Sequence, residues 1–161
     1  MVIISQLLND LQGFSIGSSG IRFLHEAEFD HGQRGYSVGS NGEALSGLEV
    51  GQWRQTLQVI GCDESCGDPI FVDTGSTDLP VYTAAHGTGS WDPVKVAKTI
   101  GGFRQSINIM AQLAAGRENP VKLRNNPIDQ TQREEVLQEI GSLNDSVDID
   151  MEFWDLIMGF Y

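Results

Sequence analysis

The sequence predicts an α+β fold: a twisted antiparallel β-sheet flanked by helices, with a helical extension at the C-terminal end. Three observations lead to this fold class. Short runs rich in β-branched and aromatic residues lie between residues 56 and 86, joined by connections too short for parallel crossovers. Apolar residues recur at helical spacing from 99 to 115, and two more helical patterns follow nearer the C-terminus.

Length and composition predict one domain spanning residues 1–161. The chain has 161 residues, of which 40% are hydrophobic and 20% charged, and this balance is typical of a folded globular protein. Apolar runs stay well short of the roughly 20 residues that cross a bilayer. The start has neither a basic segment nor a cleavage-like site, so we expect a cytoplasmic protein without a membrane anchor.

The first part of the chain predicts only short elements. Residues 2–11 carry apolar side chains that fit a short helix, which the glycines of 13–20 then break. Alternation predicts a strand at 21–24, and the turn-forming residues of 37–47 predict an exposed loop.

The strand signals are clearest in the middle of the chain. We expect strands at 56–60, 69–73 and 79–86, each bounded by glycine, proline or short polar residues. Because the second connection is too short for a crossover, the three strands should form an antiparallel meander. Residues 55–116 would then hold the sheet and its main helix, and residues 117–161 the helical extension.

Helix signals follow the last of these strands. Asp92 and the proline after it have the pattern of an N-cap and first helical position, which predicts a short helix at 93–98. A longer helix is expected at 99–115, ended by Gly116. Residues 119–127, with proline near both ends, read as a connector.

Two helices are expected in the extension. Thr131 and Glu134 fit a capping box for a helix at 129–144. Asp150 can cap a last helix at 151–158.

Acidic residues dominate the chain, whose formal net charge is −12. Residues 55–92 contain six acids and no lysine or arginine, whereas 93–126 contain six bases and one acid. Nucleic-acid binding is disfavoured because it needs a basic face, while an acidic surface attracts basic proteins. The candidate partner-binding residues are Asp63, Glu64, Asp68, Asp73, Asp78, Trp91 and Asp92.

No cofactor or metal is expected. Cys62 and Cys66, even with His86, fall short of the four ligands of a structural zinc site, so we interpret them as reduced thiols. The glycine-rich loop at 87–90 lacks the lysine of a phosphate-binding loop, and Asp92 beside it would repel phosphate.

The sequence does not predict a catalytic site. His86 with Asp68, Asp73 or Asp92 supplies residue types for a base and its orienting carboxylate. The nucleophile would have to be Ser65, Ser90, Thr83 or Cys66, but no G-x-S-x-G motif is present. We expect His86 to end a strand and to form local hydrogen bonds.

Three tryptophans are expected to be large apolar anchors: Trp53, Trp91 and Trp154. Trp91 lies in a glycine-flanked loop, which favours partial exposure and a role in binding.

Short motifs follow one another in a fixed order along the chain: Ile60-Gly61, Gly67-Asp68, Phe71-Val72-Asp73, Pro80-Val81-Tyr82, His86-Gly87, Trp91, Ala97, Phe103 and Phe153-Trp154. This series resembles the SUKH superfamily, particularly its bacterial branch. The resemblance covers residues 55–104 and, more loosely, 119–158, while the front lacks the family's leucine-proline-x-x-tyrosine helix.

This resemblance implies binding without catalysis. Bacterial proteins of this kind are immunity proteins that bind and block toxins, often nucleases, delivered by neighbouring cells. A basic toxin is thus the expected partner, and the resemblance leaves the oligomeric state open. Two alternatives remain: a regulatory or scaffolding protein for cell-envelope or housekeeping partners, as in the eukaryotic branch, and a hydrolase using His86 and nearby carboxylates.

Overall fold

A curled antiparallel sheet of six strands forms the centre of the molecule, with strand order β1-β2-β3-β4-β5-β6. The computed structural model describes residues 4–159, apart from the side chains of residues 5 and 6. The strands are β1 Phe14–Ile16, β2 Ser19–Phe23, β3 Leu57–Asp63, β4 Pro69–Asp73, β5 Val81–Thr83 and β6 Val94–Ala97. Every strand pairs with its neighbour in the chain, so the α+β class and the expected antiparallel meander are confirmed.

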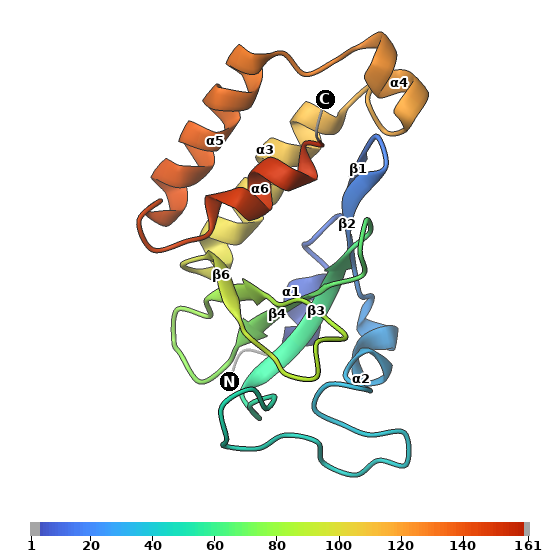
Figure 1. The fold of residues 1–161 in the computed structure, drawn as a ribbon, viewed down its shortest axis with the longest axis vertical. Coiled ribbons are helices and arrows are strands. Elements are labelled where there is room, and N and C mark those ends of the chain that lie inside the picture. The colour runs from blue at the N-terminus through green and yellow to red at the C-terminus, as the bar shows by residue number, and fades with distance from the viewer. Residues whose placement is uncertain (1–3, 160–161) are drawn as a thin grey trace.

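Helices precede the sheet, interrupt it and follow it (Figure 1). They are α1 Ile4–Leu8, the 3₁₀ turn η1 Glu26–Glu28, α2 Phe29–Gly32, α3 Ile100–Ala114, α4 Pro120–Asn125, α5 Gln130–Asn144 and α6 Met151–Ile157. The helix expected at 2–11 is present as α1, although residues 2 and 3 lie outside the described residues. Figure 1 places α3, α5 and α6 together on one side of the sheet.

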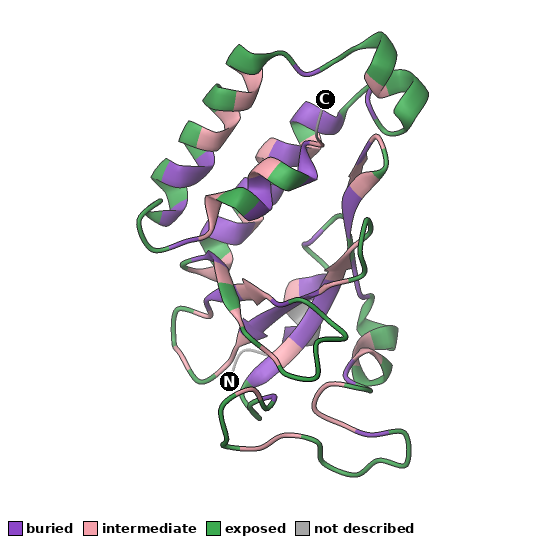
Figure 2. Ribbon diagram, viewed as in Figure 1, coloured by how far each residue is buried: buried purple, intermediate pink, exposed green. Residues whose placement is uncertain are grey.

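Both faces of the central strands are covered. On one face Phe23 packs edge-on against Phe103 of α3, whose ring also contacts Trp154 of α6. On the other face Phe71 packs against Trp53 and Tyr82. Because side chains alternate across a strand, the run Pro69–Val72 is buried throughout. Figure 2 shows this buried centre, and the exposed outer side of α5.

The strand β6 corrects a sequence prediction. Residues 93–98 were expected to form a helix capped by Asp92, but Val94–Ala97 pairs with β5 instead. The helix start lies later, at Thr99, whose side chain accepts a hydrogen bond from the Gly102 amide. Two valines that alternate with other residues suit a strand, and threonine is among the residues favoured at an N-cap.

Other boundaries also differ from expectation. The glycines of 13–20 form a hairpin between β1 and β2, with Gly17 at a φ of 59°, where only a break was expected. The strand expected at 79–86 spans only Val81–Thr83. The connector 119–127 contains α4, which Asn119 caps.

The ends of the later helices show which caps are used. The capping box of α5 is formed by Asp129 and Gln132, so the predicted box of Thr131 and Glu134 is wrong. Asp150 does cap α6, through a hydrogen bond from the Glu152 amide. The long helix α3 also agrees with its prediction, because it ends just before Gly116, whose φ is 77°.

The helical extension covers the edge of the sheet formed by β6 and contacts the β1–β2 turn. On β6, Val96 O accepts from Trp154 Nε1 at 2.9 Å. The Lys95 carbonyl of the same strand accepts from the Asp150 amide at 2.7 Å. In the β1–β2 turn, the Gly17 amide donates to Arg117 O at 2.8 Å. Residues 117–154 thus satisfy edge groups that would otherwise be free to pair with another chain.

Candidate functional site

A cleft of about 800 Å³ opens between one end of the sheet and the C-terminal helices. Its walls are the β1–β2 hairpin, the β3–β4 turn, the chain at the end of β5, and the helices α4 and α6. This volume falls in the range of roughly 300–1,000 Å³ that is typical of ligand sites. Its chief lining residues are Ile16, Asp63, Cys66, Asp68, Thr83, Ala84, Val94, Leu123, Arg124, Asp150, Phe153 and Leu156.

The cleft is apolar at its base and partly open to solvent. Ile16, Ala84 and Phe153 are buried and line it from three separate elements. Two large apolar side chains in the lining remain exposed: Val94 at 39% and Leu156 at 40%. Large apolar side chains that stay wet in a concave site are typical of surfaces that bind something.

The charged groups of the cleft are mostly acidic. Asp63 and Asp68 lie on the sheet side, Asp150 lies at the start of α6, and Arg124 lies on α4. Within residues 4–159, neither Asp63 nor Asp150 forms an ion pair, and Asp68 pairs only with His86. The cleft therefore carries more negative than positive charge, and most of that charge is uncompensated.

The β3–β4 turn holds Asp63 in place through local hydrogen bonds. Asp63 Oδ1 accepts from the Ser65 amide and from Ser65 Oγ, both at 2.6 Å. The turn closes through Gly67, which has a φ of 81° and donates its amide to Asp63 O. A side chain at Gly67 would be strained at this φ, so the aspartate-glycine composition of the turn explains its shape.

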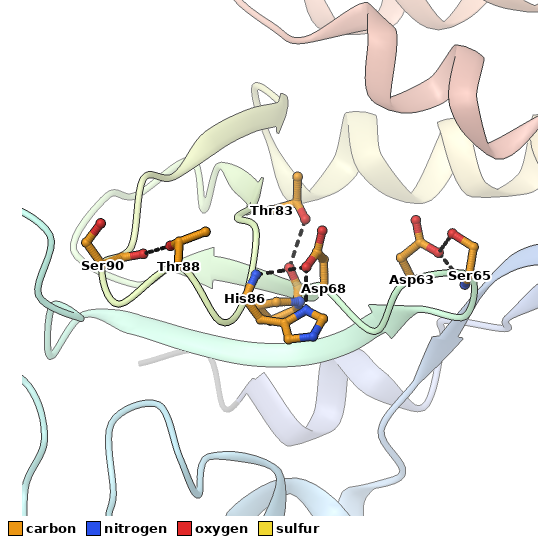
Figure 3. A network of polar contacts seen from close by, with 8 residues as sticks. Asp63, Ser65, Asp68, Thr83, His86, Thr88 and Ser90 are labelled. Atoms are coloured by element: carbon orange, nitrogen blue, oxygen red, sulfur yellow. Dashed lines mark hydrogen bonds and ion pairs between the residues drawn. The ribbon is translucent and has the colours of Figure 1, made fainter.

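Asp68 is the centre of a second set of contacts, which Figure 3 shows together with the turn. Its Oδ1 accepts from the His86 amide at 2.9 Å and lies 2.6 Å from His86 Nδ1. Thr83 Oγ1 donates to Pro69 O beside it at 3.0 Å. These bonds tie the β3–β4 turn to the chain that leaves β5, so the sheet side of the cleft is a connected unit.

The pKa of Asp68 reflects these contacts. Burial alone would raise the pKa of the carboxyl, but hydrogen bonds from His86 and from the Cys66 thiol outweigh burial and lower it. Partial desolvation raises the pKa of the Cys66 thiol, and its hydrogen bond to the Asp68 carboxylate raises it further. Asp68 is thus ionised and Cys66 protonated near neutral pH.

This geometry does not join a nucleophile to a base. The Asp68 carboxylate helps to raise the pKa of the Cys66 thiol, and Ser65 directs its hydroxyl to Asp63. Thr83 Oγ1 donates to the Pro69 carbonyl. In the loop beyond His86, Thr88 Oγ1 donates to the Ser90 carbonyl. In the described part of the chain, none of these side chains hydrogen-bonds to the His86 imidazole, the contact that would activate one of them.

The structure brings only two of the predicted partner-binding residues into the cleft, Asp63 and Asp68. Glu64 accepts from Ser15 Oγ at 3.1 Å and lines a neighbouring hollow with Ser15. Asp73 ends β4 at the opposite end of the sheet, where it pairs with Arg54 at 3.5 Å, and Asp78 is exposed in the loop that follows.

Trp91 and Asp92 occupy a third location. The Trp91 ring packs 5.1 Å from Trp53 and 5.4 Å from Tyr36, and its amide donates to Gly51 O. Trp91 is therefore half-buried in an aromatic cluster, while Asp92 beside it is exposed. The predicted residues do not form one continuous surface.

The helical wall of the cleft was missed by sequence reasoning. Leu123 and Arg124 come from α4, a helix that the sequence did not predict. Asp150 was recognised only as a cap, and Leu156 only as part of a helical pattern. The excess of acids after residue 126 was the one signal that this part of the chain contributes charge.

Fold and cleft define an α+β protein with a curled antiparallel sheet and an acidic, partly apolar cleft at one end. Comparisons with protein-family models, curated proteins and solved structures found no match. None of the described helices combines the length and apolar character needed to cross a membrane. Among residues 4–159, no three His, Cys, Asp or Glu side chains form a group that could hold a metal ion.

Proposed function

We propose that this protein is a non-enzymatic binding module that neutralises a basic bacterial toxin by direct contact, as an immunity protein of the SUKH type. The observation that carries the proposal is the acidic character of the cleft, which Asp63, Asp68 and Asp150 line with Arg124 as the one lysine or arginine of the lining, and in which, within the described residues, only Asp68 is paired, with His86. The motif series of residues 55–104 supports the same function through its resemblance to bacterial immunity proteins.

Electrostatic attraction explains how a protein with an acidic cleft inhibits a basic toxin. A nuclease toxin needs a basic surface to hold its substrate, because the phosphate backbone supplies most of the binding energy. An acidic protein is attracted to that surface and gains encounter rate from the attraction. Once bound, it occupies the surface on which the nucleic acid would lie, so inhibition needs no chemical step.

The direct test is a calorimetric titration of this protein with the protein encoded beside it in the genome. We expect tight binding that weakens as the salt concentration rises, because exposed charges are screened over about 10 Å at 0.1 M salt. Asp63→Asn removes one cleft charge while keeping the oxygen that accepts from Ser65, and should weaken binding by about threefold or more.

Asp78→Asn is the matched control. It removes the same charge from an exposed loop at the opposite end of the sheet, so binding should change by less than about twofold. Salt-independent binding, or equal effects of the two variants, would refute recognition through the cleft charge. A neighbouring gene that encodes an envelope or housekeeping protein bound with the same salt dependence would favour the regulatory alternative.

A further inference from the structure

The apolar part of the cleft goes beyond what charge recognition requires. Leu156 and Val94 keep 40% and 39% of their surfaces exposed, and both line the cleft beside buried Phe153. These side chains come from α6 and β6, two elements that the Trp154–Val96 hydrogen bond holds together. A partner that contacted only the cleft carboxylates, Asp63, Asp68 and Asp150, would leave this apolar surface in water.

The cleft is also held in shape without a ligand. On the sheet side, the bonds of Asp63 and Asp68 fix the β3–β4 turn. On the helix side, the Gly17 amide donates to Arg117 O, which holds the β1–β2 hairpin beside the chain that enters α4. A Cβ at Gly17 would lie 2.7 Å from Leu123 Cδ2, so hairpin and helix are in close contact. A preformed site loses little conformational freedom on binding.

Charge and apolar surface together specify the occupant. Asp63 and Asp68 lie on one wall and Asp150 on another, around a base formed by Ile16 and Phe153. A segment that fills such a site needs an apolar side chain at its centre and cationic groups beside it. An uncharged apolar segment would leave Asp63 and Asp150 without a cationic partner, and an acidic one would be repelled.

On the basis of the proposed function, we propose that the cleft receives one large apolar side chain from a loop of the partner protein, flanked there by lysine or arginine. The apolar side chain fills the space between Leu156, Phe153 and Ile16. The flanking cations face Asp63, Asp68 and Asp150. A buried anchor surrounded by a polar rim is the usual arrangement of strong protein contacts.

Synthetic peptides test this inference without the partner. The first probe has one central tryptophan between two pairs of lysines, the second replaces the tryptophan by serine, and the third replaces the lysines by glutamates. Backbone amide spectra of the ¹⁵N-labelled full chain report where each peptide binds. We expect the tryptophan-lysine peptide to shift the amides of residues 16–19, 63–68 and 153–156, and to bind about tenfold more tightly than the serine peptide. The glutamate peptide should not bind.

A pair of leucine variants provides the control. Leu156→Ala shortens a side chain in the cleft and should weaken the tryptophan-lysine peptide by about fivefold. Leu48→Ala makes the same change at a side chain that is 102% exposed and outside the cleft, and should have no effect. Equal binding of the tryptophan and serine peptides, or shifts that lie outside the cleft, would overturn the apolar anchor.

The two proposals can fail separately. If the genome-encoded partner binds with the expected salt dependence but Leu156→Ala leaves that binding unchanged, the acidic binding function survives and the anchor does not. If the tryptophan-lysine peptide fills the cleft but the neighbouring protein does not bind, the anchor site stands and the toxin-neutralising function is wrong.

Discussion

Gly101 and Gly102 are adjacent in α3, but their surroundings differ. A Cβ at Gly101 would meet only Thr99 Oγ1, at 3.7 Å. A Cβ at Gly102 would lie 2.5 Å from Asn144 Oδ1. Asn144 is buried, and its amide nitrogen donates to Ser106 Oγ and Ile140 O, so it cannot easily move away. Gly102 is thus required where α3 meets α5, whereas Gly101 is not.

Alanine at these two positions should change stability in opposite directions. Gly101→Ala is expected to raise the free energy of unfolding by about 0.5–1 kcal/mol, because alanine restricts the unfolded chain and favours helix. Gly102→Ala should lower it by about 1–3 kcal/mol, because the methyl group overpacks the contact with Asn144. Urea unfolding of both variants measures the difference. Equal effects would mean that the α3–α5 contact adjusts freely.

The Asp68 carboxylate should make stability depend on pH in a defined direction. Its pKa in the folded protein lies below the ordinary value of 3.8. The contribution of Asp68 is therefore fully present above 3.8 and is lost as the pH falls through the lowered value. Asp68→Asn should be less stable than the natural protein near neutral pH, and the difference should shrink on acidification.

Urea unfolding at neutral pH and in acid tests this prediction. Asp78→Asn, which removes an exposed carboxylate without an ion pair in residues 4–159, controls for the change of net charge. A difference between Asp68→Asn and the natural protein that persisted in acid would show that the carboxylate has only a packing role.

At the scale of elements, β6 shows why local sequence signals were insufficient to predict whether residues 93–98 form a helix or a strand. The sequence around Asp92 has a good helix start, but Thr99 supplies a second one, and both are consistent with local propensity. The choice is made by contacts with β5 and α6, which lie far from each other in the sequence. The meander of β3, β4 and β5 was predictable because short connections determine its pairing, whereas the partners of β6 were not.

The hydrogen bond from Trp154 Nε1 to Val96 O links α6 to β6, and both residues are buried. Trp154→Phe keeps an aromatic ring but removes the indole N–H, so the Val96 carbonyl loses a partner. We expect a loss of about 1–3 kcal/mol in the free energy of unfolding, as for other buried polar groups left unsatisfied.

Trp91→Phe is the comparison for this variant. The Trp91 ring contacts Tyr36 and Trp53, but in the described part of the chain its indole N–H makes no hydrogen bond. The same substitution should therefore cost less there, by at least about 1 kcal/mol. Equal costs in chemical denaturation would indicate that ring volume, and not the hydrogen bond, stabilises the edge of the sheet.

At the scale of the whole molecule, charge was predictable in amount but not in arrangement. The sequence shows that residues 55–92 lack lysine and arginine, yet folding places Asp63 and Asp73 at opposite ends of the sheet. It also brings Asp150, which is distant in sequence, into the cleft that Asp68 lines. An antiparallel meander necessarily separates residues at the two ends of a strand, and the docking of the C-terminal helices has no local signal.

The net charge of −12 should make the folded protein more stable as salt is added. Like charges repel one another more strongly in the compact state, and salt screens that repulsion. The exposed ion pairs, such as Lys98–Asp145 and Arg104–Asp10, weaken at the same time, but each is worth only about 0–1 kcal/mol. We expect the Tm to rise by a few degrees between about 20 mM and 300 mM sodium chloride at neutral pH.

Near the isoelectric point of about 4.4 the net charge vanishes, so the same salt increase should leave the Tm almost unchanged. A Tm that fell with salt at neutral pH would mean that ion pairs outweigh the repulsion.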